Sequence, residues 1–343
     1  MTHKKKKISI KDIAKEAGVT ISTVSNVLNN TKFVREATAE RVRTAVDKLG
    51  YRPNRIARSL RTQRTGAVGI IVPDITIPFY AYVIQAMERA AIKRGYTIIL
   101  GCTFYNPGEE EQQVNLMVEQ FIDGLVFFGG YDTTDFIHSA QSRGIPVVAV
   151  DRETGDPEIP SVLVNNITAV EKAVDFLAEH GHKEIGYFTF GLEKQTVVRR
   201  RYEGYRQGLQ KHNFPFNPDF VIIDDTTKLR ETAGTYASVK KHFKNRRMPS
   251  AFITLSDCFA YGLIKAVREL GYSVPKDVSV IGFCDDQIGE YFEPALTTIV
   301  QPMEKMGYFG MNMLLDLIEN KNPETLNRVL HTDLAIRESV AAK

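Results

Sequence analysis

Residues 9–29 read SIKDIAKEAGVTISTVSNVLN and predict two short helices joined by a tight turn. Ser9 is a typical N-cap, and Asp12 stands three residues later, at the second position of a capping box. Gly18 ends the first helix, because glycine readily takes the left-handed conformation that closes a helix. Thr20 then caps the second helix. This spacing is that of a helix-turn-helix, whose second helix enters the major groove of DNA.

The second helix divides into an inward and an outward face. Its inward residues are Val24, Val27 and Leu28, and its outward residues are Ile21, Ser22, Ser25 and Asn26. A third helix is predicted over residues 36–49, where Val42, Ala45, Val46 and Leu49 share one side and Gly50 follows. Three such faces can close a small core. A generic three-helix module with solvated charges has the same pattern, so the next segment decides between the two interpretations.

Residues 52–61, RPNRIARSLR, favour a DNA-binding segment. Arginines recur there every three residues, at Arg52, Arg55, Arg58, Arg61 and Arg64. Leu60 would be exposed on such a short helix. An exposed leucine beside arginines suits a wedge between base steps in the minor groove. We therefore expect a hinge helix after the three-helix module.

Charge divides the chain in the same way. Residues 1–65 hold 16 Lys and Arg against 5 Asp and Glu, a net charge of +11, whereas the whole chain has +3 and residues 66–343 therefore −8. A basic module on an acidic body favours a nucleic-acid partner. No apolar run approaches the length of a membrane span, and the lysines at 4–7 precede a segment too charged for export, so we expect a cytoplasmic protein.

Residues 66–343 alternate between short apolar runs and one-sided helical patterns. Buried parallel strands are predicted at 67–72, 96–100, 124–128, 146–150, 185–188, 220–223, 251–254 and 278–283. Helices are predicted between them, for example at 79–94 and 257–270. This alternation is typical of doubly wound α/β sheets, which bind ligands beyond the carboxyl ends of their strands.

The residues that follow the predicted strands are polar and aromatic. They include Asp74, Phe79, Tyr80, Asp151, Arg152, Asp257, Cys284, Asp285 and Asp286. Carboxylates accept hydrogen bonds from hydroxyl groups, and aromatic rings cover the C–H face of a sugar, so this combination suits a polyol. Each Asp could instead cap the next helix, but so many on one rim favour a ligand.

These motifs together resemble the lactose-repressor (LacI/GalR) family of bacterial transcriptional regulators. The resemblance rests on IKDIA (10–14), AGVT (17–20), STVSNVLN (22–29), GYRPN (50–54) and ARSL (57–60) in the basic module. It continues in GIIVPD (69–74), DGLV (123–126), HGHKEIG (180–186), PKDVSVIGF (275–283) and PALTTIVQP (294–302). It therefore covers nearly the whole chain.

The resemblance implies a domain organisation and a set of DNA contacts. The DNA-binding domain would be 1–52, the hinge and linker 53–65, and the effector-binding and dimerisation domain 66–343. The last would consist of two periplasmic-binding-protein-type subdomains, 66–164 with 300–322 and 165–299 with 323–343. The DNA contacts implied are Ser9, Ile10, Thr20, Ile21, Ser22, Thr23, Ser25, Asn26, Asn29, Phe33, Tyr51, Asn54, Ala57 and Leu60.

The resemblance also implies the effector site. Its residues would be Asp74, Phe79, Tyr80, Asp151, Lys194, Thr196, Arg201, Leu229, Asp257, Cys284 and Asp285, with Phe79 and Tyr80 stacking and Arg201 as the anchor. The chain departs from the family at three of its positions. Cys284 replaces the usual acidic residue after the strand, Leu229 replaces the aromatic residue of relatives that bind flat rings, and Asn26 replaces a frequent arginine, which points to a less guanine-centred operator.

We therefore expect a dimeric repressor of a near-palindromic operator, switched by a small polar effector such as a sugar or sugar derivative. A carbon-metabolism regulator controlled by a partner protein and a purine-type corepressor-dependent repressor are the alternatives. The chain has no P-loop, G-x-S-x-G, H-E-x-x-H or G-x-G-x-x-G motif at a strand-to-helix junction, and we expect neither enzymatic activity nor a cofactor. The seven histidines and three cysteines lack metal-ligand spacing, so we expect no metal and reduced cysteines.

Overall fold

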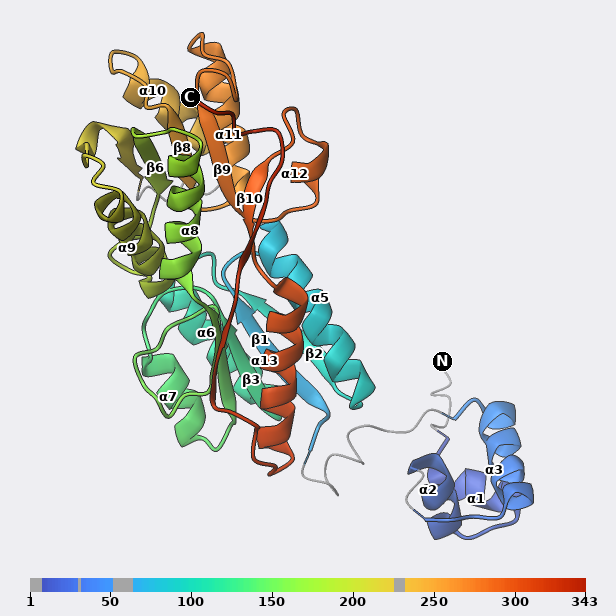
Figure 1. Ribbon diagram of the computed structural model, residues 1–343. Helices are drawn as coiled ribbons and strands as arrows, with labels where there is room; N and C mark the ends of the chain where they lie inside the picture. The colour runs from blue at the N-terminus through green and yellow to red at the C-terminus, as the bar shows by residue number, and fades with distance from the viewer. Residues whose placement is uncertain (1–7, 30–31, 52–63, 225–231) are drawn as a thin grey trace, which may run out of the picture. The chain divides into compact units, whose positions relative to one another are not determined.

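A computed structural model describes residues 8–29, 32–51, 64–224 and 232–343. The chain divides into two compact units, Met1–Thr65 and Gly66–Lys343 (Figure 1). The predicted hinge contacts Asn54, Ala57 and Leu60, and the predicted effector contact Leu229, lie outside the described residues. Each unit is considered by itself.

The N-terminal unit contains the three predicted helices, α1 (Ile10–Ala17), α2 (Ile21–Asn29) and α3 (Glu36–Leu49). The backbone N–H of Ser9 donates to the Asp12 carboxylate at 2.8 Å, which satisfies one amide at the start of α1. Gly18 ends α1 in the left-handed conformation, with φ 63°. The small core is formed by Ile13, Ala14, Ala17, Val24, Val42 and Ala45.

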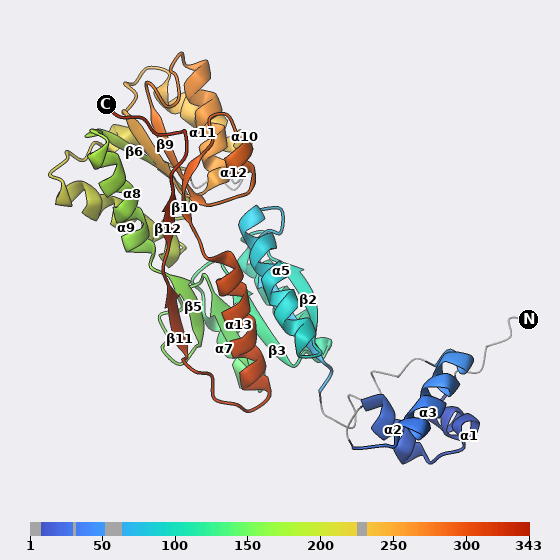
Figure 2. The ribbon, with the colours of Figure 1, turned by 45° about the vertical axis from the view of Figure 1, so that its right-hand side comes forward.

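The larger unit is built on two six-stranded sheets, one in each of two subdomains (Figure 2). The first sheet is parallel, in the order β11-β5-β4-β3-β1-β2. Its strands are β1 (Ala67–Val72), β2 (Thr97–Cys102), β3 (Gly124–Phe128), β4 (Val147–Val150), β5 (Ser161–Val164) and β11 (Asn327–Leu330). Helices α5 (Pro78–Lys93) and α13 (Met303–Ile318) cover one face, and α6 (Pro107–Glu119) and α7 (Asp135–Ser142) cover the other.

The second sheet has the order β12-β10-β9-β8-β6-β7 and is parallel except for β12. Its strands are β6 (Ile185–Thr189), β7 (Val221–Ile223), β8 (Ala251–Thr254), β9 (Ser279–Cys284), β10 (Thr297–Val300) and β12 (Asp333–Ala335). Helices α8 (Asn166–Glu179) and α9 (Thr196–Lys211) cover one face, and α10 (Thr232–Phe243) and α11 (Asp257–Glu269) cover the other. Two short helices, η1 (Pro218–Phe220) and α12 (Ile288–Tyr291), lie in the connections.

The chain passes between the subdomains three times, after β5, after β10 and after β11. The last passage differs from the prediction, which assigned residues 323–343 to the second subdomain. β11 pairs in parallel with β5, so residues 327–330 belong to the first sheet. Val300, which we assigned to the first subdomain, is part of β10 and so belongs to the second sheet. We did not predict β11 because it is an edge strand whose residues are exposed or half-buried and show no apolar run.

Helices α8 and α9 of the second subdomain pack closely against each other. A Cβ at Gly204 would lie 2.3 Å from the carbonyl oxygen of Ile167, so only glycine allows the two helices to approach this far. Tyr205 next to it is fully buried, and its hydroxyl donates to the Ile185 carbonyl at 2.8 Å. These contacts hold the backbone of α9 one turn from Arg201.

Among the helices of residues 8–29, 32–51, 64–224 and 232–343, none has both the length and the apolar character required to cross a bilayer. All three cysteines, Cys102, Cys258 and Cys284, are free thiols.

Candidate functional site

The helix-turn-helix presents its predicted DNA contacts on an outward surface. Val24 is fully buried in the core, whereas Ile21 and Phe33 are 45% and 94% exposed. The other predicted contacts that the structure describes are also exposed or half-buried: Ser9, Ile10, Thr20, Ser22, Thr23, Ser25, Asn26 and Tyr51. For Asn29 the structure describes the backbone at the end of α2 only. An exposed aromatic ring beside small polar side chains suits a surface that docks on a groove.

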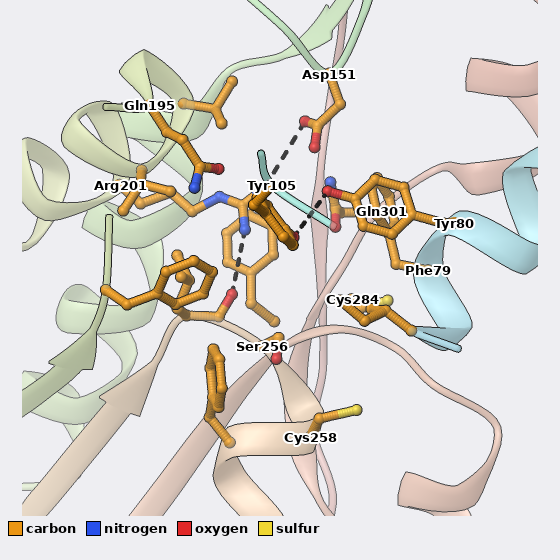
Figure 3. Close-up of a pocket in the computed structure, with 17 residues that line it drawn as sticks. Phe79, Tyr80, Tyr105, Asp151, Gln195, Arg201, Ser256, Cys258, Cys284 and Gln301 are labelled. Atoms are coloured by element: carbon orange, nitrogen blue, oxygen red, sulfur yellow. Dashed lines mark hydrogen bonds and ion pairs between the residues drawn. The ribbon is translucent and has the colours of Figure 1, made fainter. Parts of the chain in front are cut away.

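A cavity lies between the two subdomains, at the carboxyl ends of strands from both sheets (Figure 3). This cleft is lined by Ile77, Phe79, Tyr80, Tyr105, Asp151, Phe190, Gln195, Val197, Val198, Arg201, Leu255, Ser256, Cys258, Phe259, Phe283, Cys284 and Gln301. Five of the predicted effector residues are among them: Phe79, Tyr80, Asp151, Arg201 and Cys284. The position agrees with the rule that open α/β sheets bind ligands beyond their strand ends.

Arg201 and Asp151 face each other across the cleft. Arg201 comes from α9 and Asp151 directly follows β4, and the Arg201 Nη2 lies 3.9 Å from the Asp151 Oδ1. Arg201 is held by three further contacts in its own subdomain: its Nε donates to Asn166 at 2.8 Å, its Nη1 donates to the Leu255 carbonyl at 3.1 Å, and its guanidinium lies 3.7 Å from the centre of the Phe283 ring. Neighbouring Arg199 and Arg200 are exposed.

Burial dominates the electrostatics of this pair. It raises the pKa of Asp151 to about 6, and the nearby Arg201 charge opposes the shift without cancelling it. Asp151 also has a positive φ of 48°, which is uncommon for a residue other than glycine and turns the chain sharply after the strand. With Asp151 ionised, the carboxylate and the guanidinium neutralise each other, so the cleft has no net charge of its own to offer an ion.

Three buried polar atoms in the cleft wall have no hydrogen-bond partner in the protein. They are Oδ1 of Asp151, Nε2 of Gln195 and Nε2 of Gln301. Leaving such atoms unpaired costs roughly 1–3 kcal/mol each, which a ligand or water can recover. The set is one acceptor and two donors. An uncharged ligand with hydroxyl groups, which both donate and accept, satisfies it.

Aromatic rings form the first subdomain's side of the cleft. Phe79 and Tyr80 lie at the start of α5 with ring centres 5.3 Å apart, and both also pack against Phe128 in the core. The Tyr80 hydroxyl lies 3.3 Å from that of Tyr105. Burial raises the pKa of Tyr80 well above its usual value, so the phenol stays neutral and offers a hydrogen bond and a ring face.

Three predicted effector carboxylates are not in the cleft lining, because each is used by the fold. Asp74 accepts from the backbone N–H and the hydroxyl of Thr76 in a turn. Asp257 is buried beneath β9 and β10, where it accepts from Thr298 and from the backbone N–H of Asp286. Burial raises its pKa to about 6.

The third, Asp285, binds a residue of the last segment of the chain. Its carboxylate accepts from the guanidinium of Arg337 at 2.7 Å, so it ties the end of β9 to the segment that follows β12. Two interpretations were open for Asp74, Asp257 and Asp285: a structural role in the fold or contact with a ligand. The contacts present at these three positions are structural.

Lys194 and Thr196 lie at a contact between the subdomains and outside the cleft lining. The carboxylate of Asp132, in the loop after β3, accepts from the backbone N–H of Thr196 at 2.8 Å, from its hydroxyl at 2.8 Å and from Arg199 at 2.8 Å. The Asp132 N–H donates in turn to the Lys194 carbonyl at 3.1 Å. Asp132 thus acts as an anion at the N-terminus of α9, although it belongs to the other subdomain.

A buried ion pair supports the loop that carries Asp132. Arg152 lies 2.8 Å from Glu110, and both side chains are almost fully buried. The same guanidinium donates to the Thr133 carbonyl, next to Asp132. Burial raises the pKa of Glu110, with Arg152 opposing the shift. Arg152, which we noted as a polar rim residue, therefore positions the Asp132 contact.

Sequence reasoning missed several residues that the structure brings to the cleft or its edge. Gln301 lies within the stretch 294–302 that carried the resemblance, and Gln195 directly precedes Thr196, so both positions were near predicted ones. Asp132 follows a predicted strand, which was a usable signal. Cys258 directly follows the predicted Asp257, whereas Tyr105 had no such signal, because its side chain reaches the cleft only through the pairing of β1 with β2.

Comparison with known proteins agrees with these two units. Residues 9–54 match the model of bacterial regulatory proteins of the lacI family, and residues 174–340 match a periplasmic binding protein-like domain. The chain is 33% identical to the HTH-type transcriptional regulator RegA of Clostridium saccharobutylicum, over 96% of this chain and 98% of RegA. It is 32% identical to the HTH-type transcriptional repressor PurR of Klebsiella pneumoniae, over 97% of each.

A solved structure extends the comparison to the whole fold. The complex of the transcriptional regulator CelR with cellobiose superposes with a TM-score of 0.73 at 28% identity, covering 97% of this chain and 99% of CelR. The matches thus cover both the helix-turn-helix unit and the larger unit of this chain. The chain is therefore a helix-turn-helix transcriptional regulator and belongs to the lacI family of bacterial regulatory proteins.

Proposed function

We propose that this regulator is a repressor that binds a near-palindromic DNA operator as a homodimer and is switched by a small, uncharged, hydroxylated effector in the cleft. The single observation that carries the effector is the set of buried atoms on Asp151, Gln195 and Gln301 that make no hydrogen bond within the protein. CelR, a relative over its full length, is complexed with cellobiose, which supports a carbohydrate. A regulator bound to operator DNA would act in the cytoplasm.

The same observation favours a small molecule over control by a partner protein. A partner would dock on an outer surface, and it would leave the buried polar atoms of the cleft unsatisfied. A screen of sugars by thermal shift tests the proposal, because a ligand selective for the folded chain raises its melting temperature.

The homodimer is supported by apolar side chains on the first subdomain. β2 lies at the edge of its sheet, and Ile92 of α5, Leu100 of β2 and Phe104 just after it are 64%, 39% and 66% exposed. An edge strand with exposed apolar residues suits a contact with a second copy. Two DNA-binding units on one symmetric body would match the symmetry of the operator.

The switch is proposed to act through α9. The N-terminus of this helix is held by Asp132 of the other subdomain, and Arg201, one and a half turns later, faces Asp151. A ligand that bridges Asp151 and Arg201 would stabilise the closed arrangement of the subdomains. Its differential affinity for the closed form is what shifts the equilibrium.

Operator binding should depend steeply on salt. If the basic unit of residues 1–65 neutralises six or more phosphates, operator affinity should fall by on the order of 10³ or more between 50 and 200 mM salt. Fluorescence anisotropy of a labelled operator measures it. Effector affinity, measured on the same chain, serves as the control and should change little; an operator affinity equally insensitive to salt would contradict the assignment of the basic unit.

Arg201→Ala should weaken effector binding by roughly 1.5–3 kcal/mol, because a buried charge-assisted contact is lost. Arg200→Ala is the matched control: this neighbour is exposed and should matter little. Calorimetric titration with the best sugar from the screen measures both variants. Equal losses at the two positions would show that Arg201 does not anchor the effector.

Effector affinity should also fall in acid. The pKa of Asp151 is raised to about 6, so below that pH the carboxylate that accepts a ligand hydroxyl becomes protonated. If the effector binds only when Asp151 is ionised, effector affinity should drop about tenfold between pH 7.5 and pH 5. Asp151→Asn cannot titrate and should bind weakly at a pH-independent level. A wild-type profile that is flat over this range would exclude Asp151 as the acceptor.

Asp132→Ala should loosen the start of α9. The Thr196 amide then loses its acceptor, so hydrogen exchange in a peptide covering residues 194–200 should become faster in the effector-free chain. Asp135→Ala, a nearby exposed acidic position, is the control. Unchanged exchange in the Asp132 variant would mean that this contact does not hold the subdomains together.

A further inference from the structure

The larger unit begins with a residue that two hydrogen bonds hold in place. Gly66 is the first residue of this unit, and its N–H donates to the Asp123 carboxylate at 2.7 Å. Its carbonyl accepts from the N–H of Thr97 at 2.8 Å. Gly66 has a φ of 70°, a conformation that glycine adopts readily, so the chain turns here before it enters β1. The chain that comes from the basic unit therefore joins the sheet at a fixed point.

Both partners of Gly66 lie at the amino ends of the strands that flank β1. Thr97 begins β2, and Asp123 immediately precedes β3. The Asp123 N–H also donates to the Ala67 carbonyl at 2.7 Å. The cleft lies at the carboxyl ends of the strands, so the point where the chain enters the larger unit is at the opposite edge of the same sheet.

The Asp123 side chain is not required for the pairing of the strands. β1 pairs with β2 from Ala67 and with β3 from Val68, and these ladders are formed by backbone groups. The bond from the Asp123 N–H to Ala67 belongs to the backbone as well. The carboxylate adds a charge-assisted hydrogen bond one residue before the ladder begins. Its contact with Gly66 therefore fixes the end of the incoming chain rather than the sheet.

The position of this end decides how far a DNA-binding unit can reach. An extended residue spans about 3.3–3.6 Å, and successive base pairs of DNA are about 3.4 Å apart. In a dimer, one more free residue in each subunit would lengthen the span between the two DNA-binding units by about 7 Å, or roughly two base pairs. A dimer whose two chains start from fixed points is therefore restricted in the half-site spacings that it can bind.

We propose that Asp123 is a positioning residue for operator binding. By holding Gly66, it fixes the point from which each DNA-binding unit is tethered, and thereby the spacing of the two half-sites that the regulator recognises. Asp123 acts through the backbone of Gly66 and needs no contact with DNA for this role. This inference rests on the proposed function, since it assumes a homodimer on a near-palindromic operator.

Two other roles of Asp123 predict different results. If the carboxylate acted as a charge that repels phosphate groups, its removal would strengthen operator binding at every spacing. Asparagine and alanine would then have the same effect. If the carboxylate only stabilised the fold, its removal would lower the melting temperature and leave the relative affinities for different spacings unchanged.

The test measures the preference for half-site spacing with the full-length chain. An operator is first selected from random duplex DNA with the wild-type chain, and its two half-sites are then placed at the selected spacing and at one or two base pairs more or less. Dissociation constants are measured by fluorescence anisotropy at one salt concentration, with a duplex that carries a single half-site as the reference. The wild-type chain should bind the selected spacing roughly tenfold or more tightly than a spacing changed by two base pairs. In Asp123→Ala this ratio should fall roughly threefold or more, whereas the affinity for the single half-site should not change.

Two further variants are the controls. Asp123→Asn keeps an oxygen that accepts from the Gly66 N–H, so its spacing ratio should match that of the wild-type chain. Glu119→Ala removes an exposed carboxylate four residues earlier and should also behave like wild type. Hydrogen exchange in a peptide covering residues 64–72 should be faster in Asp123→Ala than in the other chains, because the Gly66 amide has lost its acceptor. Circular dichroism melting confirms that all variants fold.

The outcomes separate this inference from the function on which it rests. An Asp123→Ala chain that keeps the wild-type spacing ratio would overturn the inference and leave the proposed homodimer intact. The same holds for an Asp123→Asn chain that loses the ratio as the alanine variant does, and for an alanine variant weakened equally at every spacing and at the single half-site. If the wild-type chain binds a single half-site as tightly as any pair, the homodimer on a near-palindromic operator and the inference both fail.

Discussion

Asp151 and Arg201 face each other across the cleft from different subdomains, and the arrangement of the effector-binding unit depends on this pair. Each charge is buried, and burying a charge is costly unless an opposite charge or strong hydrogen bonds accompany it. Arg201 is secured by Asn166, Leu255 and Phe283 in its own subdomain, whereas the Asp151 Oδ1 that faces it accepts no hydrogen bond. The compensation is therefore complete on one side and incomplete on the other. Under the proposed function, a ligand that bonds to Asp151 would gain from this imbalance.

The same helix connects that pair to the edge of the cleft. Asp132 holds the first amide of α9, and the Arg152–Glu110 ion pair holds the loop from which Asp132 projects. Both contacts lie on one helix, and at Gly204 this helix approaches α8 too closely for any larger residue. In the proposed switch, a ligand held between the subdomains would therefore act on α9 and its subdomain together.

Acidic residues after strands serve two purposes in this fold, and their immediate surroundings decide which. Asp151 lines the cleft, where its carboxylate faces Arg201 of the other subdomain. Asp257 bonds to Thr298 of β10, and Asp285 bonds to Arg337, which follows β12. All three follow a buried strand and look alike along the sequence. A hydroxyl or guanidinium from a distant segment binds the last two, and neither lines the cleft.

The helix-turn-helix and most strands follow from the sequence alone, because periodicity, caps and glycine ends act within a few residues of each other. The sequence also indicated Asp151 and Arg201. Only the tertiary structure placed β11 in the first sheet, since an edge strand without an apolar run leaves no local signal. Likewise, Gln195 and Gln301 meet in one cleft although 106 positions separate them. Which polar atoms remain unpartnered depends on every other group nearby, and that balance is decided only when the distant segments are packed together.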